Sequence, residues 1–111
     1  MVETKIAAGV CGFATTVEAE CEDGQHVRLR ARTDCEKIEA LVRTLASQEF
    51  DAFEEIKNGF EGELFRNVRS ILKGCCAGCA VPVGLFKSLQ VAAGLALPRP
   101  VHIEISSSSQ G

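Results

Sequence analysis

Two consecutive stretches in the first third of the chain alternate between apolar and polar residues, and this pattern constrains the fold more than any other. "FATTVEAE" (residues 13–20) and "HVRLRART" (residues 26–33) repeat every second residue, which is the period of a β-strand with one buried face. The segment "CEDGQ" between them is typical of a tight turn. The two stretches therefore predict an antiparallel β-hairpin.

The hydrophobic pattern also predicts the register of this hairpin. A three-residue loop over residues 22–24, with Gly24 in the left-handed conformation, keeps the apolar residues of both strands on one face. A one-residue slip would mix the two faces and expose half of the apolar side chains. In the favoured register the facing pairs are Val17–Leu29, Ala19–Val27 and Glu18–Arg28.

Capping signals and apolar periodicity predict four helices between residues 33 and 94. Thr33 and Glu36 form a capping box before the first helix, and Asp51 with Glu54 forms a second box before a short helix. Pro82 suits the first turn of the fourth helix. The apolar stripes of the first, third and fourth helices are Ile38, Leu41, Val42 and Leu45; Leu64, Phe65, Val68, Ile71 and Leu72; and Val83, Phe86, Leu89 and Ala93.

The order of these elements predicts the fold class. "TKIAA" (residues 4–8) precedes the hairpin as a first strand, and "VHIEI" (residues 101–105) alternates again as a last strand after the helices. Helices segregated from an antiparallel sheet indicate an α+β fold, a two-layer sandwich of N-terminal hairpin-connected strands and a C-terminal strand on about four helices. We expect residues 1–105 to form a single domain and residues 106–111 a flexible polar tail.

Charge and hydropathy exclude several classes of partner. The net charge of −3 lacks the basic excess of nucleic-acid-binding proteins, so no nucleic acid is expected as a partner. The N-terminus does not resemble a signal peptide, and the longest apolar run, residues 75–86, is shorter than the roughly 20 residues of a membrane span. We expect a cytoplasmic protein with no membrane contact, whose partner is an unknown protein or a second copy of itself.

Charged and imidazole side chains of the strands have structural explanations. Arg28, Arg30 and Arg32 share one strand face, and the glutamates of the preceding strand favour cross-strand charge pairs over an anion-binding patch. His26 and His102 lie at outward strand positions and are expected to be solvated rather than to be ligands.

Six cysteines, three of them within "GCCAGC" (residues 74–79), are the residues most suited to carry chemistry. In a reducing compartment, thiols are free, bind metals or act in redox reactions more often than they form structural disulfides. Cys76 and Cys79 form one C-x-x-C motif, whereas a zinc ribbon needs two. Cys11 lies at an expected turn between glycines, Cys35 inside the first turn of the first helix, and Cys79 just before the fourth helix.

Turns and helix starts expose backbone N–H groups, which stabilise a thiolate or the sulfurs of a cluster. The first interpretation is therefore a zinc or iron–sulfur site with a carrier, sensor or structural role, rather than an enzyme with a catalytic site. Its ligands would be Cys11, Cys35, Cys76 and Cys79, with Cys75 as a substitute for Cys76.

Two other interpretations stay open. Free cysteine is also a common small apolar residue, so the chain could be a metal-free interaction module or homo-oligomer with structural cysteines. Its apolar surface near "AVPVGLF" and "VAAGLALP" would then dock a partner. The motif of Cys76 and Cys79 before a helix also resembles a thiol–disulfide oxidoreductase site, although no βαβ unit surrounds it. The chain lacks the signatures of dinucleotide-binding enzymes, P-loop enzymes and common hydrolases.

Three stretches of the chain, in order, resemble a family of small uncharacterised cysteine-containing proteins from anaerobic bacteria and archaea. They are "AGVCGFATTVEAE", "TDCEKIEAL" and "CAVPVGLFKSLQVAAGLALPRPVHIEI", and the resemblance extends from about Lys5 to Ile105. The family has no established activity. The resemblance implies a cytoplasmic protein of a low-oxygen cell, in which iron–sulfur clusters are usable. It also implies that the recurrent thiols are Cys11, Cys35 and Cys79, whereas Cys21, Cys75 and Cys76 are particular to this chain.

Overall fold

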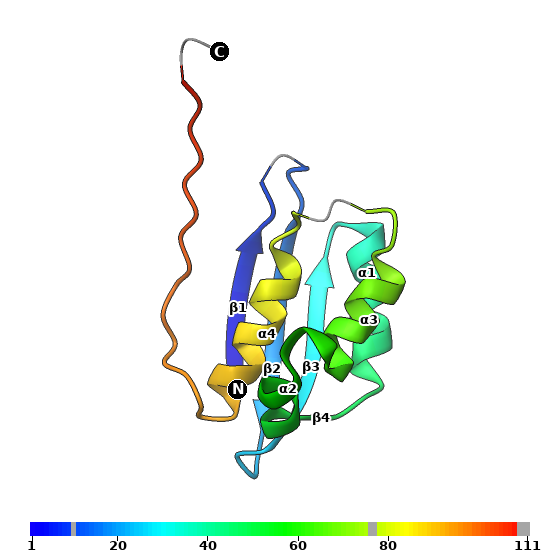
Figure 1. Ribbon diagram of the computed structural model, residues 1–111, viewed down its shortest axis with the longest axis vertical. Helices are drawn as coiled ribbons and strands as arrows, with labels where there is room; N and C mark the ends of the chain where they lie inside the picture. The colour runs from blue at the N-terminus through cyan, green and yellow to red at the C-terminus, as the bar shows by residue number, and fades with distance from the viewer. Residues whose placement is uncertain (10, 76–77, 109–111) are drawn as a thin grey trace.

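The computed structural model describes residues 1–9, 11–75 and 78–108 (Figure 1). Its antiparallel sheet has the order β1-β2-β3-β4, formed by β1 (Val2–Ala7), β2 (Ala14–Cys21), β3 (His26–Thr33) and β4 (Phe50–Asp51). The helices are α1 (Glu36–Ala46), α2 (Ala52–Asn58), α3 (Glu63–Ile71) and α4 (Val81–Ala92), with the 3-10 turn η1 (Gly59–Glu61) before α3. The predicted α+β fold is confirmed.

The helices cover one face of the sheet and bury its apolar side chains. α1 packs on β3, α4 packs on β1 and β2, and α3 packs on α1 (Figure 1). Alternate residues of β2 and β3 point into this layer, as the period of two predicts. The buried core consists of Val17, Ala19, Val27, Leu29, Ile38, Leu41, Val42, Leu45, Phe50, Ala52, Leu64, Val81, Leu85, Leu89 and Ala93.

The face of the sheet that points away from the helices carries opposite charges on neighbouring strands. Glu18 lies opposite Arg30, and Glu20 lies opposite Arg28. The closest ion pair joins Arg30 Nη2 to Glu20 Oε1 at 3.0 Å, and Arg32 Nη1 lies 3.8 Å from Glu18 Oε2. The predicted cross-strand charge pairing is confirmed, and its arginines are solvent-exposed, so each pair contributes at most about 1 kcal/mol.

The hairpin between β2 and β3 has a longer loop than predicted. Residues 22–25 separate the strands, so the predicted three-residue loop and its register were wrong. The observed pairs are Val17–Ala31, Glu18–Arg30 and Ala19–Leu29, a shift of two residues from the predicted partners Leu29, Arg28 and Val27. Because a strand repeats every two residues, this shift leaves each side chain on its predicted face.

Asp23 accounts for the longer loop. Its carboxylate accepts hydrogen bonds from the backbone N–H groups of Gln25 and His26, at 2.9 and 2.8 Å. An aspartate that binds backbone N–H groups two and three residues later closes a turn by itself. Gly24 has the predicted left-handed conformation, with φ of 75°.

The C-terminal segment is a second difference from the sequence prediction. Residues 101–105 form no strand and continue as extended chain beside β1 (Figure 1). The fourth strand is β4 instead, which pairs with β3. Alternation predicts an extended segment with one apolar face, but the partner strand depends on contacts far away in the sequence.

The buried face of α4 differs from the predicted one in the first half of the helix, whereas Leu89 and Ala93 are buried as predicted. The predicted stripe began at Val83, which is 47% exposed, and Phe86 is only partly buried against Phe65, with ring centroids 5.2 Å apart. The residues that α4 and its C-terminal end bury are Val81, Leu85, Ser88, Leu89 and Ala93.

Gly84 explains this rotation of α4. A Cβ atom at Gly84 would lie 2.3 Å from Ile6 Cδ1, so the helix contacts β1 through its own backbone. Ser88, one turn later, places its Oγ 2.6 Å from Thr4 Oγ1 and 2.7 Å from the Gly84 carbonyl oxygen. The glycine and the serine together direct this side of α4 onto β1.

A buried carboxylate connects α2 to α3. Glu55 is 3% exposed, and its two oxygens accept hydrogen bonds from the N–H groups of Glu63 (3.1 Å) and Leu64 (2.8 Å). These N–H groups open α3 and have no partner within the helix. Gly62 permits the approach, because a Cβ there would lie 3.0 Å from Glu55 Oε1. Glu55 therefore caps α3 from another helix.

Removing this cap is expected to destabilise the protein. Glu55→Ala leaves two N–H groups without an acceptor, which should lower the free energy of unfolding by about 1–3 kcal/mol, measured by urea denaturation. The control is Glu54→Ala, an exposed neighbour in α2, with an expected change of about 0.5 kcal/mol or less. Equal losses in the two variants would contradict the capping role of Glu55.

Candidate functional site

Three chain segments that carry cysteines lie at one end of the molecule. The turn between β1 and β2, the start of α1 and the segment between α3 and α4 are all found at this end (Figure 1). They carry the free thiols Cys11, Cys35, Cys75 and Cys79, and we call this region the thiol end. Cys76, a predicted ligand and half of the predicted redox pair, lies outside the described residues.

Cys11 lies in the tight turn that its flanking glycines predict. The turn is closed by a hydrogen bond of 2.8 Å from the Gly12 N–H to the Gly9 carbonyl oxygen. Gly9 and Gly12 have φ angles of 91° and 73°, which residues other than glycine rarely adopt. The residue is solvent-exposed, as expected from this position.

The prediction that Cys35 lies inside the first turn of a helix was wrong. Cys35 is the N-cap residue, which directly precedes α1. Its N–H donates to Thr33 Oγ1 at 3.2 Å, so Thr33 closes the preceding turn instead of capping the helix. The predicted capping box of Thr33 and Glu36 is therefore wrong. Cys35 is half-buried and packs against the core.

Cys75 and Cys79 both lie in the connection between α3 and α4. The Cys75 N–H donates to the Leu72 carbonyl oxygen at 2.9 Å, just after the end of α3. Cys79 precedes α4 and packs against the core. Both residues are half-buried.

The surroundings of Cys79 raise the pKa of its thiol above the ordinary value. Burial is the largest cause, because it disfavours the charged thiolate, and a hydrogen bond from the Val81 backbone opposes it. The thiols of Cys75, Cys11 and Cys35 raise the pKa further.

The thiol end does not present a ready-made metal site among the described residues. Within residues 1–9, 11–75 and 78–108, no group of three His, Cys, Asp or Glu side chains is arranged to hold a metal ion. Zinc thiolate sites need bonds of about 2.3 Å from every sulfur to the ion. A metal would therefore have to draw the cysteine-bearing segments closer together.

The geometry also bears on the thiol–disulfide alternative. An attacking cysteine in such enzymes needs a lowered pKa, so that the thiolate is present at neutral pH. The pKa of Cys79 is shifted in the opposite direction. In the predicted motif the attacking thiol is the first cysteine, Cys76, which lies outside the described residues, so this shift concerns only the second cysteine of the pair.

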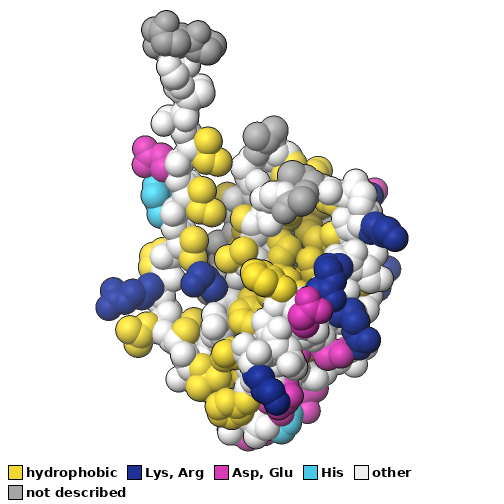
Figure 2. All heavy atoms as spheres, viewed as in Figure 1, with side chains coloured by type: hydrophobic (Ala, Val, Ile, Leu, Met, Phe, Trp, Pro, Cys, Tyr) yellow, Lys and Arg dark blue, Asp and Glu magenta, His cyan; other side chains and the backbone are white. Residues whose placement is uncertain are grey.

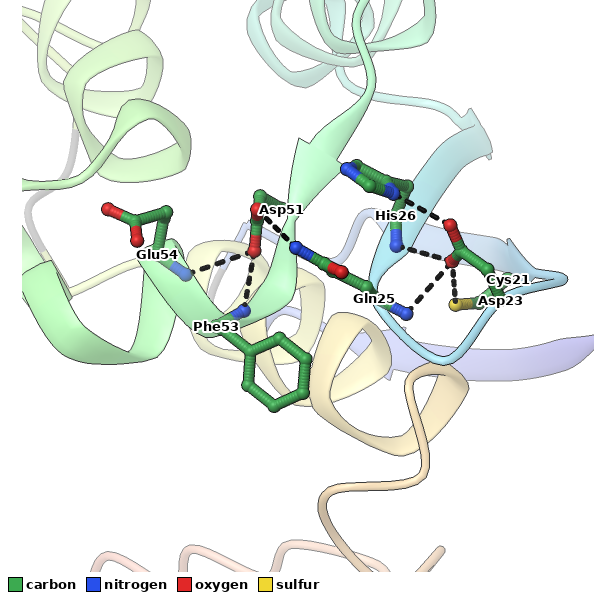
Figure 3. Close-up of polar contacts among 7 residues, drawn as sticks. All are labelled: Cys21, Asp23, Gln25, His26, Asp51, Phe53 and Glu54. Carbon is green, nitrogen blue, oxygen red and sulfur yellow. Dashed lines mark hydrogen bonds and ion pairs between the residues drawn. The ribbon is translucent and has the colours of Figure 1, made fainter.

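Cys21 lies at the opposite end of the molecule, where β2 enters its loop (Figures 1 and 3). Its thiol lies 3.7 Å from Asp23 Oδ1, to which it donates a weak hydrogen bond. This position separates Cys21 from the thiol end and makes it a natural control in experiments on the other cysteines.

A polar network that the sequence did not predict joins this hairpin loop to the start of α2 (Figure 3). Asp23 pairs with His26 Nδ1 at 2.7 Å, in addition to its backbone hydrogen bonds. Gln25 Nε2 donates to Asp51 Oδ2 at 2.8 Å, and Asp51 caps α2 as predicted. The network holds the loop and has no unexplained polar group, so we assign it a structural role.

The pairing of Asp23 with His26 should be visible in a titration. The pKa of His26 lies above 6.5 because its ring nitrogen hydrogen-bonds to the Asp23 carboxylate. A raised folded-state pKa stabilises the fold below pH 6.5, and this contribution is lost as the pH rises through the raised value. NMR of the His26 ring should give a midpoint above 6.5, and Asp23→Asn should lower it. An unchanged midpoint in Asp23→Asn would contradict the pairing.

The thiols should differ in their rates of alkylation. Cys11 is exposed, whereas Cys79 is half-buried and has a raised pKa, so iodoacetamide should modify Cys11 several times faster in the folded, reduced protein. Peptide mass spectrometry after short exposure measures both rates. The difference should vanish in concentrated urea, and equal rates in the folded protein would show that Cys79 is more accessible than its burial indicates.

Comparison with known proteins identifies a family but no activity. In the described parts of the chain, every helix is too short or too polar to cross a membrane. Neither a curated protein nor a solved structure matches the chain. A family model described as a family of unknown function (DUF6951) matches residues 2–105, a span that includes the thiol end and the C-terminal segment. The expected resemblance to an uncharacterised family is thereby confirmed, and the chain belongs to the DUF6951 family.

Proposed function

We propose that the thiol end binds zinc or an iron–sulfur cluster through Cys11, Cys35, Cys79 and either Cys75 or Cys76. The observation that carries this proposal is the convergence of three separate chain segments, each with a thiol, at one end of the molecule (Figure 1). Thiolates are the ligands that zinc, copper(I) and iron–sulfur clusters prefer.

The exposure of these thiols favours binding over packing. Cysteines that only fill space are usually fully buried. None of Cys11, Cys35, Cys75 and Cys79 belongs to the buried core, and Cys11 is open to solvent. A metal ion can therefore reach them without unfolding the domain.

The electrostatics of the region also favour a bound cation. At Cys79, burial disfavours the thiolate and raises the pKa of the thiol, and the neighbouring cysteines add to this effect. A bound metal reverses this effect, since it removes the repulsion and deprotonates its thiol ligands.

Two helix starts add to this preference. The N-caps of α1 and α4 are Cys35 and Ala80, and neither supplies a side-chain hydrogen bond to the first turn. Both helices begin at the thiol end (Figure 1). The Val81 N–H already donates to the Cys79 thiol, and the N–H groups and positive dipole ends of both helices favour thiolates and the sulfurs of a cluster.

Binding requires the ligands to gather, and the chain permits this. Cys11, Cys75 and Cys79 belong to turns and connections rather than to strands or helices. These segments can approach the start of α1 while the sheet and its core stay intact. We infer a carrier, sensor or structural role in a reducing compartment such as the cytoplasm, where free thiols persist.

Metal and acid-labile sulfide content of protein purified without oxygen tests the proposal. We expect either about one zinc ion per chain or iron with sulfide and a visible absorption band. The double variant Cys35→Ser and Cys79→Ser should lose the metal, whereas Cys21→Ser, at the opposite end, should keep it. Because the ligands release protons on binding, the affinity should fall as the pH is lowered.

Two results would contradict the proposal. One is a wild-type protein that stays folded but takes up neither zinc nor reconstituted iron and sulfide. The other is a double variant that holds as much metal as the wild type. Circular dichroism of every variant separates loss of metal from loss of fold.

A further inference from the structure

One edge of the sheet is open. β1 pairs with β2 along its length of 6 residues and is the terminal strand of the sheet. Its other edge presents backbone N–H and C=O groups that the described strands leave unpaired. Long, regular edge strands of this kind readily accept an additional strand.

A groove of about 800 Å³, lined by apolar residues and by charged ones such as Lys5 and Lys87, follows this edge between β1, α4 and the C-terminal segment. Ile6, Val83 and Val91 line it on the side of the body, and Val101 and Ile103 line it on the other side. Figure 2 shows the hydrophobic side chains of the extended segment on the side that faces the groove, with its histidine and acidic side chains on the other. Both walls of the groove are therefore suited to bury an apolar strand face.

The C-terminal segment has the alternating sequence pattern of a β-strand, but it pairs with no described strand. Val101, Ile103 and Ile105 alternate with polar residues and are 53%, 69% and 89% exposed. Residues 101–105 are extended but belong to no described strand. The family match ends at residue 105, so this segment is part of the unit that the family shares.

We propose that residues 101–105 of one copy pair with the β1 edge of a second copy, and that the exchange is reciprocal. Each sheet then gains a fifth strand, and the side chains of Val101, Ile103 and Ile105 from the partner pack against the apolar residues of the groove. Exchange of a terminal segment is a common route to symmetric dimers, because the contacts it uses already fit the chain.

The direction of residues 101–105 favours pairing of β1 with the segment of a second copy over pairing with the segment of its own chain. Residues 101–105 run beside β1 in the same direction as that strand (Figure 1), so pairing within one chain would be parallel. Every strand pair of the sheet is antiparallel. A two-fold axis perpendicular to the strands reverses the partner's segment and makes its pairing with β1 antiparallel, the more stable arrangement.

The connection after α4 supports the same arrangement. Pro98 and Pro100 lack an N–H group and favour extended chain at themselves and at the residues before them. They hold the segment away from the body of its own chain, where Val101, Ile103 and Ile105 are accessible to a partner. This inference uses no thiol and is independent of metal binding.

The mass of the full chain in solution tests this proposal. Light scattering after gel filtration in the micromolar range should give twice the 11.9 kDa of one chain. Ile103→Glu, which places a charge on the apolar face, should reduce the mass to that of one chain. The matched control His102→Glu places the same charge on the opposite face of the segment and should leave the dimer intact.

Amide hydrogen exchange distinguishes the dimer from the alternatives. Residues 101–105 and β1 should exchange slowly in the wild type and fast in Ile103→Glu. A monomer with slow exchange at 101–105 would show that the segment closes onto its own β1, and a monomer with fast exchange would show that the edge is unoccupied. Either monomer overturns the proposal, as does a dimer that Ile103→Glu leaves unchanged.

Discussion

The buried face of the β2–β3 hairpin is the constraint on which the rest of the structure depends. Val17, Ala19 and Leu29 are almost completely inaccessible to solvent, and α1 and α4 both lie on this face. Because side chains alternate, a register error of one residue would expose the whole set. Both helices pack on this face, and Cys35 and Cys79 lie just before them.

The two ends of the molecule solve the problem of unpaired backbone groups in different ways. At the end with the β2–β3 loop, aspartate side chains bind the N–H groups of the loop and of α2. At the thiol end, α1 and α4 begin without such side-chain caps. At the first end, side chains of the protein bind these groups, whereas at the second end the Val81 backbone hydrogen-bonds to the Cys79 thiol and the start of α1 has no side-chain cap.

The sequence predicted what depends on neighbouring residues and missed what depends on distant ones. The period of two in β2 and β3, the Asp51 cap and the Pro82 start are local patterns, and the structure contains all of them. The hairpin register depended on how the side chain of Asp23 folds back on its loop.

Contacts between distant elements account for the remaining differences. The face that α4 presents to the sheet depends on Gly84 meeting Ile6, and the cap of α3 comes from Glu55 in another helix. For the candidate site, local reasoning placed Cys11 in a turn and Cys79 before a helix. It could not foresee that Cys35 is the N-cap of its helix, two residues after the predicted cap, because Thr33 Oγ1 accepts a hydrogen bond from the Cys35 N–H and closes the preceding turn.

Gly84 has a consequence that reaches beyond the contact it makes. A helix is a stiff rod with a rise of about 1.5 Å per residue, so a fixed point on it fixes the position of its ends. Gly84 is such a point, because its backbone rests on Ile6 of β1. One turn earlier α4 begins, and Cys79 stands just before it. The absence of a side chain at Gly84 therefore helps to set the position of the Cys79 sulfur, although the two residues are not in contact.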